Sequence, residues 1–301
     1  MIQLLYYIVY NRHINFLIRN ILLLFHRLLP RSIKIPPAGI VRIRVENNII
    51  KLATNQTNYV THLVFWRGYR NFEYTEIFCD LIKKISCFYD IGANIGYYSL
   101  LAASINPDIK VISFEAAEGP MYYLRRNIVI NKLNNIHPEP LAIAGEIGEV
   151  EFIHYKNPKY RNLRYNLGGE GHVAGTVTGE YVFKEKVRSI TLDKYVEVSG
   201  EKNIDLIKLD TEGTEDIILK CSKEVLENIK PVIICETLFN RIEPAIETIA
   251  SSYGYLFYNH YPGGLKKVET IKRTYDDGVR NCFLVHPSKL YLISDYLSRD
   301  I

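Results

Sequence analysis

The stretch Tyr89-Asp90-Ile91-Gly92-Ala93-Asn94-Ile95-Gly96 indicates the fold of this chain more clearly than any other. It closes a hydrophobic run that begins at Cys87 and opens a helix-like run, so it predicts a strand that turns directly into a helix. Glycines at such a turn let a ligand lie against bare backbone. The stretch therefore predicts a cofactor site at a strand end of an α/β sheet.

Two residues of this turn discriminate between cofactors. Asn94 stands where a dinucleotide fingerprint has its middle glycine, and its side chain obstructs the approach of a pyrophosphate. Asp90 ends the strand, and its carboxylate repels phosphate but attracts an ammonium or sulfonium group. The methionine end of S-adenosylmethionine carries both cations, so we expect this methyl donor. The predicted contacts from the turn are Asp90, Gly92, Asn94, Gly96 and Tyr97.

Length and composition describe an ordinary globular protein. The 301 residues suffice for one large domain with an appendage, and 48% of them are hydrophobic. The net charge of +4 falls short of the basic stripe of a nucleic-acid-binding protein, so no nucleic-acid partner is expected. The five cysteines include no Cys-x-x-Cys pair, which predicts neither a disulfide framework nor a zinc site and favours the cytoplasm.

The first 29 residues are apolar, but polar residues interrupt them before a membrane-spanning length is reached. Met1 to Tyr10 carries no positive charge, unlike a secretory signal. The segment either packs on protein or lies on the inner face of a membrane as a peripheral helix. If the segment lies on a membrane, the basic residues expected to face the lipid headgroups are Arg12, Arg19, Arg27 and Arg31. Prolines then end the pattern, so we predict an apolar, basic helical appendage over 1–37 and a main domain over 38–301.

From Cys87 onward, strand-like runs alternate with helical stretches, which predicts a parallel sheet covered on both faces. The predicted strands are Cys87–Asp90, Val111–Glu115, Leu141–Ala144, Ile204–Asp210, Val232–Glu236, Tyr255–Asn259 and Cys282–His286. No helix is evident between the last two, so we expect them to pair antiparallel. The fold class is an α/β Rossmann-like methyltransferase fold, with a mostly parallel, twisted seven-stranded sheet and an antiparallel last strand.

Glu115 ends the second predicted strand, where a carboxylate can accept both ribose hydroxyls of an adenosine. Asn127 and Asn131 share one face of the following helix and either order the adenine side of the pocket or hydrogen-bond the adjoining loop. We expect Glu115, Asn131 and Ala142 to contact the cofactor.

A second cluster of charged residues, Lys208 to Glu215, follows the central strand and should face the cofactor. Lys208 and Asp210 point the same way and form either a structural ion pair or part of the catalytic machinery. Asp210 and Glu212 are also expected cofactor contacts, and Glu236 ends the next strand. These three carboxylates could hold magnesium, but hard-cation sites leave no reliable spacing signature, so no metal site is predicted.

With these motifs the chain resembles the FkbM-type methyltransferases over roughly Tyr74 to Tyr258. The matching segments, in the family's order, are Tyr89–Ser99, Ser113–Glu115, Asn127–Asn131, Thr191–Asp193 and Ile204–Glu215. The resemblance implies a Rossmann-like S-adenosylmethionine-dependent enzyme, commonly an O-methyltransferase acting on sugars or other hydroxylated metabolites. The family's usual acid-proline pair is Glu115-Ala116 here, so the loop that follows should differ in shape.

Methyl transfer to a hydroxyl needs a group that receives the proton. Asp210 and Glu236 are the first candidates, and Lys208 is a catalytic candidate beside them. His172 follows a glycine-rich stretch that could close over the substrate. This stretch belongs to a predicted substrate-side insertion around residues 156–189. The expected acceptor is a hydroxylated small molecule, a glycan or a glycolipid.

Two alternatives belong to other functional classes. An NAD-dependent oxidoreductase is opposed by Asp90 and Asn94, for the reasons given above. A non-catalytic, membrane-associated binding subunit is opposed by the presence of Asp90, Glu115, Asp210 and Glu212. Methylation of a nucleic-acid base usually goes with an Asp/Asn-Pro-Pro-aromatic element, and this chain has Asp210-Thr211-Glu212-Gly213 at that place.

Overall fold

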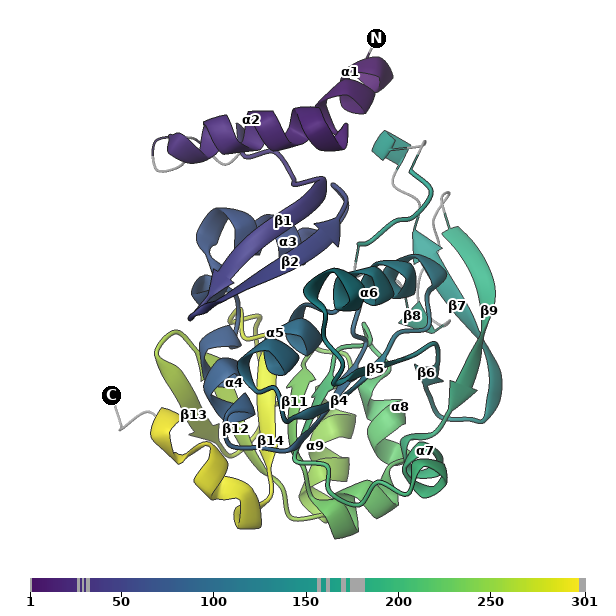
Figure 1. Ribbon diagram of the computed structural model, residues 1–301. Coiled ribbons are helices and arrows are strands. Elements are labelled where there is room, and N and C mark those ends of the chain that lie inside the picture. Colours follow the sequence, from purple (N-terminus) through teal and green to yellow (C-terminus); the bar gives the residue numbers. More distant parts are fainter. Residues whose placement is uncertain are drawn as a thin grey trace.

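The computed structural model describes residues 2–25, 28, 30, 33–155, 158–160, 163–168, 172–173 and 182–297. Its centre is an eight-stranded sheet in the order β13-β12-β14-β11-β10-β3-β4-β5 (Figure 1). The strands are β3 (Cys87–Ile91), β4 (Lys110–Phe114), β5 (Ile136–Glu139), β10 (Leu206–Leu209), β11 (Val232–Glu236), β12 (Leu256–Tyr261), β13 (Gly264–Val268) and β14 (Asn281–Val285). The pairs that involve β14 or β13 are antiparallel, and the other neighbouring pairs are parallel.

This sheet confirms the predicted Rossmann-like fold with an antiparallel last strand, and it corrects two details. The sheet has eight strands rather than seven, because the hairpin partner β13 extends its edge. The strand next to β4 is β5, whereas the predicted strand Leu141–Ala144 belongs to a second sheet. Pro138 lies within β5, and an edge strand tolerates a proline because one side of it carries no ladder hydrogen bonds.

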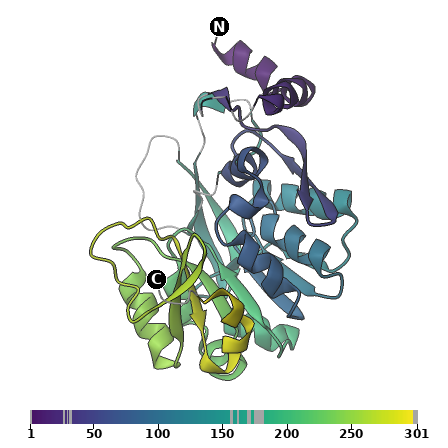
Figure 2. The same cartoon turned by 90° about the vertical axis from the view of Figure 1, so that its left-hand side faces the viewer.

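Helices cover both faces of the sheet (Figure 2). They are α4 (Thr75–Ile82), α5 (Tyr97–Ile105) and α6 (Glu118–Asn131) on one face, and α7 (Leu192–Ser199), α8 (Glu215–Lys220) and α9 (Glu243–Ser252) on the other. Successive side chains of a strand point to opposite faces. Phe88 therefore joins the core beneath α4 and α5, while Tyr89 joins the core beneath α7 to α9. Five-residue and shorter helical segments complete these layers at Tyr69–Asn71, Pro158–Tyr160, Val225–Ile229 and Ser294–Tyr296, with a six-residue one at Pro287–Leu292.

A second, four-stranded sheet has the order β6-β9-β7-β8. Its strands are β6 (Ala142–Ile143), β7 (Gly148–Tyr155), β8 (His172–Val173) and β9 (Val182–Ile190). The insertion expected around 156–189 thus forms part of a sheet that begins earlier, at β6. Because β6 pairs with β9, the chain passes from the main sheet to the second sheet directly after β5.

The N-terminal part contains α1 (Ile2–Val9), α2 (Arg12–Leu24), the hairpin β1 (Gly39–Val45) and β2 (Asn48–Thr54), and α3 (Tyr59–Arg67). The hairpin buries alternate residues, such as Val41 and Ile43, in the core that it shares with α4 and α5. It therefore belongs to the main domain. No helix in the described ranges is both long enough and apolar enough to cross a membrane.

Asn127 and Asn131 fix β2 to α6. Asn127 Oδ1 accepts from the N–H of Ala53 at 2.6 Å, and Asn131 Oδ1 accepts from the N–H of Lys51 at 2.8 Å. The amide of Asn131 also donates to the carbonyl of Lys51 at 2.7 Å. One turn of a helix and two residues of a strand rise by similar distances. Two asparagines one turn apart on α6 can therefore bond two alternate residues of β2. The polar atoms of Asn131 are thus engaged with β2 in this structure, and its expected contact with the cofactor stays a prediction.

Candidate active site

A cavity of about 660 Å³ lies beyond the carboxyl ends of β3, β4, β10 and β11. This is the edge at which open α/β sheets bind ligands. The turn after β3 lines one side, and α3, β7 and residues 166–168 line the others. The predicted site residues that line the cavity are Gly92, Asn94, Tyr97, Glu115, Ala142, Lys208, Asp210, Glu212 and Glu236.

The turn after β3 needs glycine at two positions because of chain packing. Gly92 has φ 78°, and a Cβ atom there would lie 1.9 Å from the carbonyl oxygen of Asp210. Gly96 has φ 87°, and a Cβ atom there would lie 2.4 Å from Leu124 of α6. Gly96 therefore lets α5 and α6 pack closely and does not itself line the cavity. Asn94, with φ 50°, occupies the left-handed region that asparagine tolerates.

Asp90 lies behind the cavity wall, which corrects the expected direct contact with the donor. It is 1% exposed, and its Oδ2 accepts from the backbone N–H and the hydroxyl of Ser99 at 3.1 and 2.5 Å. Its Oδ1 lies 3.7 Å from Nζ of Lys208, which also lies 3.0 Å from Asp210. A buried carboxylate needs such partners. Of the two interpretations of Lys208 and Asp210, the ion pair is what the structure contains.

Glu115 follows β4 and lines the cavity. Its Oε2 accepts from the N–H of Asn94 at 2.8 Å, and its Oε1 accepts from the N–H of Ala117 at 2.8 Å. Each carboxylate oxygen has a second lone pair, so both can still accept from a ligand hydroxyl. Burial raises the pKa of Glu115 to about 7, although the two N–H groups oppose this shift.

Four acidic residues line the opposite side of the cavity, and we refer to Glu73, Asp210, Glu212 and Glu236 as the carboxylate group. Asp210, Glu212 and Glu236 each offer an oxygen within 4.8 Å of the others. Their spacing is compatible with a divalent cation. Glu73 and Glu212 have φ values of 43° and 60°, and such left-handed conformations at non-glycine residues concentrate at functional sites.

The acidic surroundings in this cluster raise the pKa of two of its members, Glu236 and Glu73. Burial, followed by the charges of Asp210 and Glu212, raises the pKa of Glu236 to about 9, and its Oε2 has no hydrogen-bond partner among the described residues. Enclosure by the cavity walls and the charge of Asp210 raise the pKa of Glu73 to about 7, while its side chain stays open to the cavity. Tyr98 donates to Glu73 at 3.2 Å. The cavity is thus prepared for a cationic ligand, which would lower these pKa values.

Glu215 holds the loop that carries Glu212. It begins α8, is fully buried, and accepts from the backbone N–H groups of Thr211 at 2.6 Å and Gly213 at 3.0 Å. The macrodipole favours an acid in the first helical turn. Glu215 therefore positions its neighbours and is not itself part of the cavity lining.

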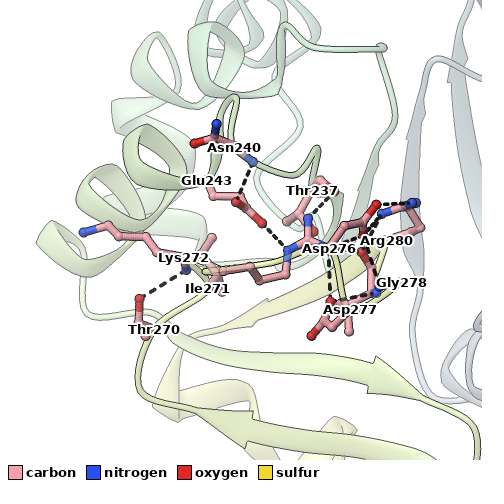
Figure 3. A network of polar contacts seen from close by, with 12 residues as sticks. Thr237, Asn240, Glu243, Thr270, Ile271, Lys272, Asp276, Asp277, Gly278 and Arg280 are labelled. Carbon is pink, nitrogen blue, oxygen red and sulfur yellow. Dashed lines mark hydrogen bonds and ion pairs between the residues drawn. The ribbon is translucent and has the colours of Figure 1, made fainter.

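A polar network fixes the end of β11, next to Glu236 (Figure 3). The N–H of Thr237 donates to the carbonyl of Arg280 at 2.8 Å, and the carbonyl of Thr237 accepts from Arg273 at 3.1 Å. The Arg273 side chain is 7% exposed and also pairs with Glu243 at the start of α9. The backbone on both sides of the carboxylate is thereby held in place.

Several cavity residues lie outside the sequence motifs. Glu73 and Asn58 come from segments before β3, and His154 comes from β7, where its ring lies 2.7 Å from Glu185. Asn58 donates to Asn94 at 3.2 Å and so joins the N-terminal part to the glycine turn. These residues belong to no motif with a characteristic spacing and do not directly follow a predicted strand, so the sequence does not indicate that they line the cavity. The backbone of His172 lies in β8, while its side chain lies outside the described residues.

The residues present fit S-adenosylmethionine. Glu115 would hold the ribose, and the carboxylate group would face the ammonium and sulfonium cations. The acidic lining disfavours a pyrophosphate at the same place. The fold and this cavity together define a Rossmann-like methyltransferase.

The comparisons with known proteins agree. Residues 90–257 match the model of the methyltransferase FkbM domain, so the chain belongs to the FkbM methyltransferase family, and its methyl donor is S-adenosylmethionine. This confirms the resemblance seen in the sequence and favours the methyltransferase over the NAD-dependent oxidoreductase. The methyltransferase sdnD of Sordaria araneosa is 25% identical over 211 residues, which are 61% of this chain and 81% of that protein.

Two solved structures are similar to the chain at low sequence identity. A methyltransferase FkbM from Methylobacillus flagellatus KT has a TM-score of 0.43 and 14% identity, over 67% of this chain and 44% of that one. A precorrin-6y C5,15-methyltransferase from Geobacter metallireducens GS-15 has a TM-score of 0.39 and 10% identity, over 70% and 88%.

Proposed function

We propose that this enzyme transfers a methyl group to a hydroxyl of a sugar, a glycan or a related hydroxylated metabolite. The observation that supports this most is the carboxylate group beside the donor cavity. Hydroxyl groups need a proton acceptor to become good nucleophiles, and carboxylates also hydrogen-bond the neighbouring hydroxyls of a sugar.

The sheet order separates the two ends of the donor. Glu115 follows β4 and Glu236 ends β11, with β3 and β10 between them. Three strand spacings correspond to about 14 Å. The ribose would therefore lie over β4 and the reacting methyl group near β10 and β11, where the acceptor hydroxyl must also lie.

The members of the carboxylate group have different roles in this proposal. S-adenosylmethionine, when bound, supplies the methyl group on its sulfonium. Glu73, whose pKa of about 7 suits a general base, accepts the proton of the acceptor hydroxyl. Asp210, which pairs with Lys208, orients a neighbouring hydroxyl. Glu236, whose Oε2 has no hydrogen-bond partner among the described residues, hydrogen-bonds the substrate.

The test is methyl transfer from labelled S-adenosylmethionine to fractionated glycans, glycolipids and small hydroxylated metabolites. We expect a methyl ether, identified by mass spectrometry of the product. Glu73→Gln should lower kcat at least about a hundredfold, far more than it lowers donor affinity. Glu76→Gln, on the exposed side of α4, is the matched control. A methyl group found on nitrogen or carbon, or a Glu73→Gln enzyme with normal kcat, would contradict the proposal.

A further inference from the structure

The second N-terminal helix is attached to the protein through polar side chains. Asn15 and Arg19 of α2 are 0% and 2% exposed. Asn15 accepts from the N–H of Ala38 at 2.7 Å, and Arg19 donates to the carbonyls of Ala38 at 2.9 Å and Ile40 at 2.6 Å. A helix that packs on its own domain normally buries its apolar face and exposes its polar residues. Here the polar residues face the protein.

The helices α1 and α2 lie above the domain in Figure 1, and many of their apolar side chains are exposed. The most exposed of them are Leu4 (64%), Leu5 (57%), Tyr7 (68%), Phe16 (50%), Leu17 (61%), Ile21 (59%) and Leu24 (79%). A contiguous apolar surface of this kind marks a site of interaction with a partner or a membrane. We refer to it as the apolar helix surface.

The distribution of these side chains favours lipid over a protein groove. On a helical wheel of α2, Phe16 and Leu23 lie on one side of Asn20, while Leu17 and Leu24 lie on its other side. A protein groove covers a single stripe of a helix, such as i, i+3, i+4 and i+7. The exposed apolar side chains of α2, from Leu23 round to Ile14, span about half of the helix circumference, which suits a helix lying in the surface of a bilayer.

The charge of this part of the chain specifies the kind of membrane. Residues 1–45 contain seven Lys and Arg residues and no Asp or Glu. Arg12 is exposed at the start of α2, and Arg42 and Arg44 are exposed on β1. Basic residues beside an apolar helix attract anionic headgroups and add to the affinity from apolar burial.

We propose that the apolar helix surface docks on a bilayer that contains anionic lipids. The contact is linked to the active site through Tyr160, whose ring packs edge-on against Tyr6 of α1 and against Tyr10, which follows α1, with centroids 5.8 and 5.3 Å apart. A few residues further along the chain, residues 166–168 line the cavity. Docking therefore positions the cavity wall that residues 166–168 line next to the membrane.

Flotation of the full chain with vesicles tests this proposal. We expect binding to vesicles of phosphatidylcholine with phosphatidylglycerol, weaker binding to phosphatidylcholine alone, and a decrease at high salt. The double variant Leu17→Asp, Ile21→Asp should lower the partition coefficient about tenfold or more. The control variant Val198→Asp, Tyr291→Asp changes exposed side chains elsewhere (71% and 64%) and should bind normally.

The same samples give the outcomes that contradict the proposal. Absence of binding to anionic vesicles would overturn it, as would equal binding by the Leu17→Asp, Ile21→Asp variant. If the unchanged chain elutes as a dimer and that variant as a monomer, without vesicle binding by either, a second copy covers the surface instead. Circular dichroism and binding of S-adenosylhomocysteine check that both variants are folded. A Leu17→Trp variant gives a second measurement, a blue-shifted emission on binding, because the single native Trp66 is buried.

Discussion

A Cβ atom on Gly92 would lie 1.9 Å from the carbonyl oxygen of Asp210. This contact joins the glycine turn after β3 to the charged segment after β10, two motifs more than a hundred positions apart in the sequence. The end of β10 thus packs directly on the turn, and a methyl group cannot fit between them. The glycine is required by the neighbouring backbone as well as by its positive φ.

Gly92→Ala should therefore lose more stability than the backbone conformation alone explains. Gly200 has a similar φ of 68°, and none of the described atoms beyond its chain neighbours lies within 4 Å of where a Cβ would stand, so Gly200→Ala serves as the control. We expect Gly200→Ala to cost about 1–2 kcal/mol and Gly92→Ala clearly more, with loss of donor binding. Chemical denaturation and calorimetric titration with S-adenosylhomocysteine measure both effects. Equal losses in the two variants would show that the contact is unimportant.

Lys208→Met should destabilise the protein strongly. The change removes the ammonium group that faces Asp90, whose carboxylate is buried, and an unpaired buried charge costs about 3–5 kcal/mol. The control is Lys110→Met, which breaks an exposed pair with Glu201 and should cost less than about 1 kcal/mol. Urea denaturation at neutral pH measures both free energies of unfolding. Similar values for the two variants would argue against a buried ion pair.

Glu236→Gln should change how stability depends on pH. Glu236 titrates at about 9 in the folded chain and near 4.5 in the unfolded chain, so the folded state retains a proton that the unfolded state releases. Its stabilising contribution is complete below pH 4.5 and falls as the pH rises towards 9. The melting temperature of Glu236→Gln relative to the unchanged protein should therefore be higher at about pH 8 than at about pH 5. Glu224→Gln controls for removal of an exposed negative charge, and a difference independent of pH would refute the prediction.

Asn131→Ala distinguishes a structural role from cofactor binding. The side chain bonds both polar backbone groups of Lys51, so its loss should cost about 1–3 kcal/mol of stability. Affinity for S-adenosylhomocysteine should stay within about twofold, because Asn131 does not line the cavity. A large loss of affinity with unchanged stability would show instead that Asn131 contacts the cofactor.

Glu115→Gln tests the ribose contact. The amide of glutamine cannot accept through both atoms, so one backbone N–H or one ribose hydroxyl loses its partner. We expect affinity for S-adenosylhomocysteine to fall at least about tenfold, since losing a hydrogen bond to a charged group costs about 1.5–3 kcal/mol. Glu146→Gln, on an exposed loop, is the control. Unchanged affinity in Glu115→Gln would contradict the proposed binding mode.

The sequence alone determined the fold class and the methyl donor, and it predicted a donor site at the strand ends. Local signals were sufficient for this: the glycines of a strand-to-helix turn, the apolar run Ile204–Leu209, and acidic residues directly after strands. Each of these signals involves residues that are close together along the chain, so it can be recognised from their spacing in the sequence.

Only the tertiary structure decided which polar residues face the cavity. Asp90 and Asn131 carry the same kind of side chain as residues that line the cavity. The carboxylate of Asp90, however, contacts Lys208 and Ser99, and the side chain of Asn131 bonds the backbone of β2. Glu73 reaches the cavity from a segment that has no motif. The hydrogen-bond partners of buried groups come from distant segments of the chain, and they determine the direction in which a side chain points. The spacing of residues in the sequence therefore does not show which polar side chains face the cavity.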